Sequence, residues 1–269
     1  MDLLKFFAFT YAISWTCFFA ATSPSLVALR PLFLAIGVAA PAIVALSLSR
    51  SFSLLRRVIQ WRVGARWYLF AVGFMAAIKI AAALLHRVAV GAWPRFGSDS
   101  WYLIVAAIVI STPFQSGEEI GWRGYALPRL AARFGYPGAS LILGVIWACW
   151  HLPIFFMPGA DKYGQSFPLY VLQVTALSVA LAWLYMNTNG SLLLVMLMHS
   201  AVNQTKDIVP SAVPEATNSF TFSSSVVAWL TVTLLWICAG YFLLRMRAQS
   251  GARAALLLSR GHELFADRP

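Results

Sequence analysis

Charged residues are scarce in this sequence, and acidic ones are the scarcest. Only 11% of the 269 residues are Asp, Glu, Lys or Arg, and nine of them are Asp or Glu. Soluble domains carry about 25% charged residues, so this composition excludes an ordinary soluble domain. The net charge of +11 does not predict nucleic-acid binding. The Arg residues lie between apolar stretches, as in membrane topology signals and contacts with anionic lipid.

Cysteine is also rare. The three cysteines, Cys17, Cys149 and Cys238, lie far apart, and each falls within an apolar stretch. None belongs to a CxxC pair, so neither a disulfide framework nor a cysteine zinc site is predicted. Cys149 and His151 are two positions apart and would face different sides of a helix, which argues against a Cys/His dyad.

Long apolar stretches dominate what is present. Hydrophobic residues make up 60% of the chain, and the mean hydropathy is +0.74. About 20 apolar residues cross a bilayer as a helix, and backbone groups in lipid must pair within the chain. We therefore predict an all-α fold, a polytopic membrane helix bundle of about eight transmembrane helices. The predicted spans cover approximately residues 3–22, 31–49, 67–90, 101–118, 138–157, 168–187, 191–209 and 224–245.

The spans are expected to form one compact membrane domain with four regions. Residues 1–100 hold the first helices, including an amphipathic basic segment at 50–66 that is suited to lie in the membrane interface. A plain basic loop would explain this segment as well. A central region follows at 101–209, then a last transmembrane helix at 210–246 and a basic tail at 247–269. We expect the first helix to stay uncleaved, because its apolar run contains Tyr11 and Trp15.

Lysine and arginine are distributed unevenly between the two faces of this bundle. The N-terminus, the linkers near 50–66 and 123–133, and the tail share one face and carry most of the basic residues. The positive-inside rule then places both termini in the cytoplasm. The expected location is a bacterial-type plasma membrane, with the lipid bilayer as the surrounding partner.

A pair of adjacent carboxylates ends the fourth predicted span. Neighbouring helix positions differ by about 100°, so Glu118 and Glu119 cannot share one role. Glu119 and Arg123 are four residues apart and can pair on one helix face. Glu118 then has no local partner, and a partly buried carboxylate of this kind can act as a general base. An ion pair at a helix end on the membrane surface is the alternative.

Two histidines lie inside other predicted spans. His151 follows Trp147 by one helical turn, and Pro153 opens the helix locally behind it. His199 and Asn203 are four residues apart and present two polar groups on one face. Either group could simply bond a neighbouring helix. Ionisable groups in lipid are costly, however, so one shared polar cavity explains all three segments more economically than three separate structural roles.

These segments resemble the motifs of the CPBP family of intramembrane proteases, the CAAX prenyl endopeptidase and bacteriocin-processing family formerly called the abortive-infection family. The residues that carry the resemblance are Glu118-Glu119-x-x-x-Arg123, Trp147-x-x-x-His151 and His199-x-x-x-Asn203. The resemblance covers roughly residues 101–205, which makes 101–209 the expected catalytic core. Trp147 departs from the Phe that the family more often has.

The resemblance implies a role for each motif residue. Glu118 would activate the hydrolytic water, and His151 would help to hold that water. His199 and Asn203 would stabilise the oxyanion, while Glu119 and Arg123 would orient the site. The implied activity is hydrolysis of a peptide bond in a membrane-anchored or lipidated, CAAX-type protein or peptide.

A metal-dependent version of the site stays open. Glu118, His151 and His199 form a His₂-carboxylate set of the kind that zinc accepts, and Glu119 could then serve as the base. The HExxH pattern of zincins is absent from the sequence. We leave zinc as a possible cofactor.

Two other functions and one geometric difficulty also follow from the sequence. A non-catalytic membrane protein, such as an immunity or scaffold factor, could keep the polar cluster for helix packing. A small-solute transporter would favour paired halves with interrupted helices, and no such repeat is visible. Glu118 is expected near the membrane surface and His151 about 20 Å along the next span. The two can meet only if the span that ends at Glu118 stops below the membrane surface, or if the span that holds His151 begins outside the hydrocarbon. Gly117, Gly121 and Gly124 would permit a helix break there.

Overall fold

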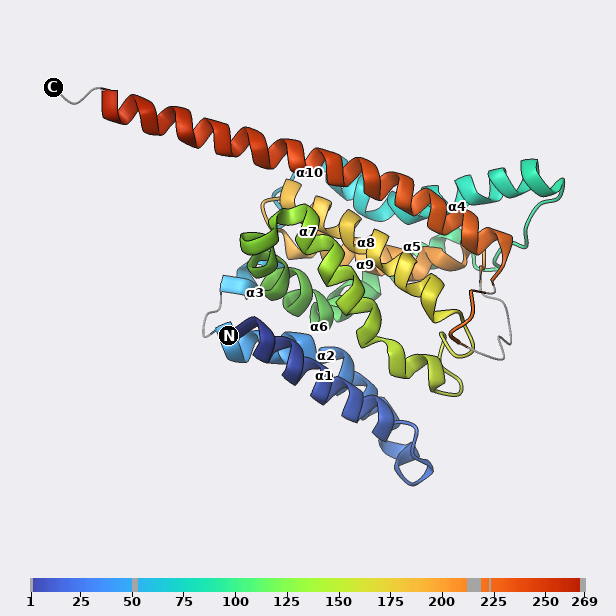
Figure 1. Ribbon diagram of the computed structural model, residues 1–269. Coiled ribbons are helices and arrows are strands. Elements are labelled where there is room, and N and C mark those ends of the chain that lie inside the picture. Colours follow the sequence, from blue (N-terminus) through green and yellow to red (C-terminus); the bar gives the residue numbers. More distant parts are fainter. Residues whose placement is uncertain (1, 50–52, 212–218, 223, 267–269) are drawn as a thin grey trace.

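The chain folds into a helical bundle. The computed structural model describes residues 2–49, 53–211, 219–222 and 224–266, with the backbone alone at 207 and over 252–266, and no strand occurs in these ranges (Figure 1). The elements, in chain order, are α1 Asp2–Ala20, η1 Pro24–Leu29, α2 Arg30–Ser49, α3 Ser53–Val58, α4 Ala65–Val90, α5 Trp101–Ser111, η2 Thr112–Gln115, α6 Ser116–Glu119, η3 Ile120–Ala126, α7 Leu127–Trp150, η4 Leu152–Phe156, α8 Phe167–Asn187, α9 Leu192–Thr205, η5 Lys206–Ile208 and α10 Val226–Ala266.

The prediction of a polytopic membrane helix bundle is confirmed. Six helical stretches in the described residues are long and apolar enough to cross a membrane: Asp2–Ala20, Pro24–Ser49, Ala65–Val90, Trp101–Phe156, Phe167–Asn187 and Val226–Gly251. The sequence predicts about eight spans, two more than these six stretches. One of them is α9, whose 14 residues extend only about 21 Å against a hydrocarbon core of about 30 Å. The other is part of the continuous stretch from Trp101 to Phe156.

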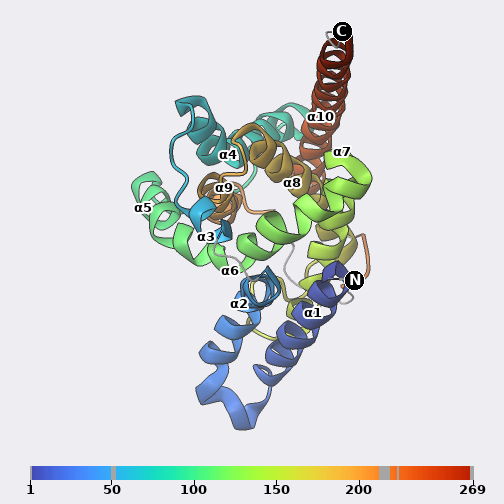
Figure 2. The ribbon, with the colours of Figure 1, turned by 90° about the vertical axis from the view of Figure 1, so that its left-hand side faces the viewer.

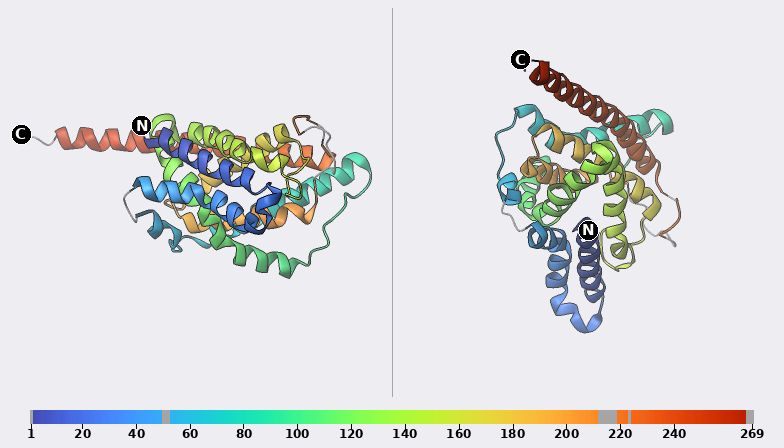
Figure 3. Two further views of the ribbon diagram at one scale, coloured as in Figure 1. Left: turned by 90° about the horizontal axis from the view of Figure 1, so that it is seen from below. Right: turned by 60° about the vertical axis from the view of Figure 1, so that its left-hand side comes forward.

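The helices are arranged in an interior group and a projecting hairpin. Every residue of α8 from Val174 to Met186 is buried, and a helix that is apolar all round belongs inside a bundle. α7 packs along α8, and α9 lies against α4 and α5. α1 and α2 form a hairpin that extends away from this group (Figures 2 and 3). The start of α1 and the end of α10 lie on the same side of the molecule (Figure 1).

The loop predicted between the spans 101–118 and 138–157 is wrong. The chain stays helical there, passing through the single turn of η2, the short α6 and the π-helical η3 into α7. Pro113 lacks the amide hydrogen that a continuing α-helix needs, so α5 ends at Ser111. The chain reverses farther on, at Gly135, whose φ of 66° suits glycine.

This correction changes the place of one arginine. Arg123 was counted among the basic residues of a surface linker, but its side chain is fully buried. Its carboxylate partner is provided by α6, one turn earlier in the same continuous helix. The two other arginines of that region, Arg129 and Arg133, remain exposed and keep their expected place at the surface.

Glycine lets α2 approach the segment that carries the carboxylates. A Cβ built at Gly121 would lie 2.6 Å from the backbone carbon and oxygen of Pro41, closer than real Cβ atoms come. At Gly117 it would lie 3.2 Å from the Ala39 Cα. The backbones of α2 and η3 therefore touch directly, and the helix containing Glu118 and Glu119 is held deep in the bundle.

The regions outside the core follow the expectation in outline. Leu54 of α3 is buried, whereas Leu55, Ile59 and Trp61 are exposed, as in a segment with one face toward lipid. Residues 50–52 lie outside the described part. α10 runs without a break from the predicted last span through most of the basic tail, because Ala, Leu and Arg after residue 247 favour helix. The tail side chains from 252 on are not described.

Candidate active site

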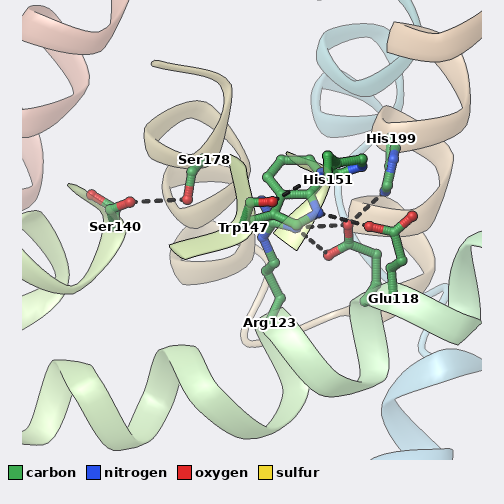
Figure 4. A network of polar contacts seen from close by, with 8 residues as sticks. Glu118, Arg123, Ser140, Trp147, His151, Ser178 and His199 are labelled. Carbon is green, nitrogen blue, oxygen red and sulfur yellow. Dashed lines mark hydrogen bonds and ion pairs between the residues drawn. The ribbon is translucent and has the colours of Figure 1, made fainter. Parts of the chain in front are cut away.

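The two adjacent glutamates are buried and point to different neighbours. Both lie on α6, where Glu119 is fully buried and Glu118 is 7% exposed. Figure 4 shows the Glu118 carboxylate among side chains from α7 and α9. The sequence argument that the pair cannot share one role agrees with this geometry. The two carboxylates have separate sets of partners.

Glu119 is the centre of a charged network. Arg123 Nη1 donates to Glu119 Oε1 at 2.8 Å and to Oε2 at 3.1 Å, which confirms the predicted pair. His199 Nδ1 lies 2.7 Å from the same Oε1 atom. Both oxygens of Glu119 are therefore engaged, and this carboxylate links α6, η3 and α9.

The side chain of Arg123 is fully buried. Its guanidinium carbon lies 4.0 Å from the centre of the Trp147 ring, in cation–π geometry. The Nε and Nη2 atoms are buried and have no hydrogen-bond partner among the described residues. A buried guanidinium is tolerated only when it is paired, so Arg123 depends on Glu119 for its charge compensation.

Glu118 has one hydrogen-bond partner among the described residues. Trp147 Nε1 donates to Glu118 Oε2 at 2.7 Å. Glu118 Oε1 makes no hydrogen bond with any residue in the described part of the chain. This carboxylate therefore keeps one oxygen free to accept a proton from a bound water, whereas the oxygens of Glu119 are already occupied.

His151 ends α7 and has a defined tautomer. Its Nδ1 lies 2.9 Å from the backbone oxygen of Trp147. A carbonyl oxygen only accepts, so Nδ1 carries the hydrogen, and in the neutral ring Nε2 presents a lone pair. His151 Nε2 has no partner among the described side chains and backbone groups. It is available to hold a water by accepting one of its hydrogens.

His199 faces the same group of side chains from α9. Its Nδ1 donates to the Glu119 carboxylate, so Nε2 is the nitrogen left for a ligand. The ring lies 5.2 Å from the Trp147 ring, centre to centre, in an edge-to-face arrangement. Trp147 thus contacts Glu118, Arg123 and both histidines, and it is the side chain around which the motifs assemble.

Asn203 stands apart from this group. It lies one turn beyond His199 on α9, but its side chain is exposed, and it makes no hydrogen bond within the described residues. The structure brings together Glu118, Glu119, Arg123, His151 and His199, and it leaves Asn203 at the edge. Its role on the oxyanion remains a prediction.

The reversal at Gly135 removes the difficulty of joining Glu118 to His151. η3 and the first half of α7 carry the chain past the buried glutamates, and the second half of α7 returns alongside. The Glu118–Trp147 hydrogen bond joins residues 29 positions apart, and His151 follows Trp147 by one turn. The helix does not break at Gly117, Gly121 or Gly124, because the chain stays helical there and passes from α6 into the π-helical turns of η3. Such turns often occur at functional sites.

Two contributions were not found from the sequence. Trp147 was read only as a large aromatic residue, although its indole N–H is the hydrogen-bond donor to Glu118. Tyr170 of α8 packs with its ring 5.4 Å from that of His151 and 5.1 Å from that of Phe155. No motif marks Tyr170, because α8 is mostly apolar and its few polar residues have no distinctive spacing.

The donor set does not form a three-ligand metal site in this geometry. Among the described residues, no three His, Cys, Asp or Glu side chains are placed to hold one ion. Both Nδ1 atoms are used within the protein, and the two carboxylates have different partners. Glu118 Oε1 and the Nε2 atoms of both histidines have no partner in the described part of the chain, so zinc bound by Glu118, His151 and His199 stays a prediction, and the chemistry below uses the side chains alone.

Replacement of Trp147 by Phe tests the indole hydrogen bond. Phe keeps an aromatic face for Arg123 and an edge for His199 but leaves Glu118 Oε2 without its donor. A buried charged group that loses its partner costs about 1–3 kcal/mol. We expect Trp147→Phe to lower the free energy of unfolding by that amount, measured by thermal unfolding in detergent. Unchanged stability would contradict a structural role for this bond.

Comparison with known proteins gives the same assignment as the motifs. The family model described as type II CAAX prenyl endopeptidase Rce1-like matches residues 96–205. A protein named CAAX prenyl protease 2 from Methanococcus maripaludis is 28% identical over 98 residues, which cover 34% of this chain and 36% of that relative. The match thus spans about a third of the relative's length. The stretch 96–205 that the family model matches contains all six motif residues, so this part of the chain is similar to the type II CAAX prenyl endopeptidase Rce1-like family, as the recognised resemblance predicts.

Proposed function

We propose that the protein is an intramembrane endopeptidase that hydrolyses a peptide bond of a membrane-anchored or lipidated, CAAX-type protein or peptide. The observation that carries this proposal is the environment of the Glu118 carboxylate. Its carboxylate is buried, is oriented by Trp147, and keeps one oxygen free beside two histidines. The family match supports the same class of reaction.

In the proposed reaction Glu118 is the general base. It takes a proton from a water held at its free oxygen and at His151 Nε2, and the resulting hydroxide attacks the scissile carbonyl carbon. The carbonyl oxygen becomes an oxyanion, which His199 Nε2–H, in the protonated ring, and the Asn203 amide would stabilise. Glu118 then gives its proton to the leaving nitrogen as the C–N bond breaks. Water is consumed, and a carboxylate and an amine are formed.

Glu119 and Arg123 have a positioning role in this scheme. Glu119 accepts from His199 Nδ1, which fixes the ring so that Nε2 points away from the carboxylate. Arg123 compensates the charge of Glu119 and packs on Trp147, which in turn orients Glu118. The network thus connects the proposed base, Glu118, with His199, which is proposed to stabilise the oxyanion.

The membrane is the expected environment of both enzyme and substrate. The protein is an integral membrane protein, as its long apolar helices require. We further propose that it lies in a bacterial-type plasma membrane with both termini in the cytoplasm. This proposal is supported by the excess of basic residues near the termini and the 50–66 segment, even without the buried Arg123.

The proposal is tested with the full-length protein in liposomes and a fluorescence-quenched peptide with a farnesylated CAAX end. We expect release of the C-terminal fragment from this peptide and much slower release from the same peptide without the lipid. Cleavage should persist after treatment with a zinc chelator, because no step is assigned to a metal. Loss of cleavage that added zinc restores would overturn the base mechanism, and no cleavage of either peptide would overturn the proposed substrate class.

A non-catalytic membrane protein is the second candidate, and one observation favours it. The Glu119 network ties three helical elements together, as a cluster retained for packing would. A packing cluster needs no unshared carboxylate oxygen, so this candidate does not account for Glu118. The Glu118 substitution described in the Discussion separates the two functions.

A further inference from the structure

A second charged cluster lies outside the motifs, at the end of the bundle where α7 and α9 stop. Asp161 and Lys162 belong to the segment between η4 and α8, and Lys206 is the first residue after α9. Lys162 Nζ lies 3.1 Å from Asp161 Oδ2, and Lys206 Nζ lies 3.0 Å from the same oxygen. These three residues are called the Asp161 clasp below, since they join the α7–α8 segment to the end of α9.

The clasp has more positive than negative charge. Two ammonium groups share one carboxylate, and all three groups reach the surface, with Asp161 the most exposed at 52%. Burial alone raises the pKa of the Asp161 carboxyl, but Lys162 and Lys206 lower it to about 2. Asp161 is therefore ionised at neutral pH, and the cluster keeps a net charge of +1. Such a cluster is able to accept a second carboxylate.

The clasp is connected to the candidate active site through Tyr170. Lys162 Nζ lies 5.6 Å from the centre of the Tyr170 ring, and the His151 ring packs against the same Tyr170 ring with its centre 5.4 Å away. Lys162 is also close enough for its charge to act on His151. The positive charge of Lys162 and the His151 ring thus lie against the same Tyr170 ring.

Lys206 is connected to the candidate active site along one face of α9. His199, Asn203 and Lys206 occupy positions i, i+4 and i+7, which share a helix face, and Lys206 keeps helical backbone angles. The face changes from buried at His199 to exposed at Asn203. At about 1.5 Å per residue, Lys206 lies about 10 Å beyond His199 along the helix.

That distance equals the length of a short peptide. A CAAX end carries three residues after its modified cysteine, and three extended residues reach about 10 Å. A peptide whose scissile carbonyl lies at His199 would therefore bring its terminal carboxylate to the level of Lys206. Its negative charge would complement the net positive charge of the clasp.

We propose that Lys162 and Lys206 bind the free C-terminal carboxylate of the substrate, and that Asp161 occupies this position in its absence. The proposal rests on the proposed function and defines its specificity: the enzyme selects a bond a fixed, short distance from a free C-terminus. Asp161 acts as an internal competitor, so substrate entry exchanges one carboxylate for another at the two lysines.

Binding tests this proposal independently of cleavage. The ligands are two farnesylated CAAX peptides that are identical except for a free carboxylate or a C-terminal amide. Their affinities are measured in liposomes with the cleavage-deficient Glu118→Gln protein. We expect the acid to bind about tenfold more tightly, the size of a charged hydrogen bond, and Lys162→Met with Lys206→Met to abolish the difference. Equal affinity of the acid and the amide would overturn the proposal, even if the wild-type protein cleaves both.

Asp161→Asn distinguishes recognition from a structural clasp. If Asp161 competes with the substrate, its neutral variant binds the acid more tightly and the amide as before. If the clasp only fastens the α7–α8 segment, the same variant weakens or leaves unchanged the binding of both peptides, and the proposal is wrong. Lys5→Met is the matched control, because Lys5 is exposed on the first turn of α1 and its loss should change neither affinity.

Discussion

Glu118→Gln is expected to lower the rate of peptide cleavage by about 10²- to 10⁴-fold while the protein keeps its fold. This range is the contribution that a positioned general base makes to catalysis. Gln has nearly the same shape as Glu, and its amide oxygen can still accept from Trp147 Nε1, which donates to Glu118 at 2.7 Å. Only the negative charge and the ability to take a proton are removed.

The measurement is the turnover of the farnesylated peptide in liposomes, together with the unfolding temperature of each variant in detergent. Glu118→Gln should match the wild-type protein in unfolding temperature and in affinity for the peptide. A variant that still cleaves at the wild-type rate would falsify the assignment of Glu118 as the base. Loss of cleavage together with loss of folding would favour the non-catalytic candidate, in which the cluster serves packing.

The sequence alone predicts the fold class and most of the residues that form the polar cluster. Apolar stretches longer than a bilayer is thick determine a helical bundle almost alone, because lipid leaves the backbone no other partners. Glu119 and Arg123 could be paired because both lie on one helix, where a separation of four residues gives contact. The rarity of ionisable residues in such a chain marked Glu118, His151 and His199 as members of one site.

What the sequence could not predict depends on packing between distant segments. The basic residues between the predicted spans 101–118 and 138–157 suggest a surface linker, whereas the chain there is helical and bends at Gly135. Arg123 is buried since Glu119 and the Trp147 ring compensate it, and this compensation exists only in three dimensions. The exposed position of Asn203 follows from where α9 ends, which periodicity does not determine precisely enough.

Glu119→Gln, in contrast to the substitution at Glu118, is expected to destabilise the protein by about 3–5 kcal/mol. This is the usual effect of removing one partner from a buried ion pair, because the remaining charge stays in the interior without compensation. Arg123 is fully buried, and its only ion-pair partner in the described chain is Glu119. His199 also loses its charged acceptor. The two substitutions should therefore have different effects: Glu118→Gln lowers the cleavage rate, and Glu119→Gln lowers the stability.

A double-mutant cycle decides whether the uncompensated arginine causes this loss. Thermal unfolding in detergent is measured for Glu119→Gln, Arg123→Met and the double variant. Replacing a whole buried ion pair by groups of similar volume is often nearly neutral, so the double variant should be more stable than Glu119→Gln. If the two losses simply add, the charge of Arg123 is compensated elsewhere, and Glu119 does not hold the network together. A favourable coupling energy would instead show that Glu119 is retained to keep Arg123 buried beside Trp147, where it supports the indole that orients Glu118.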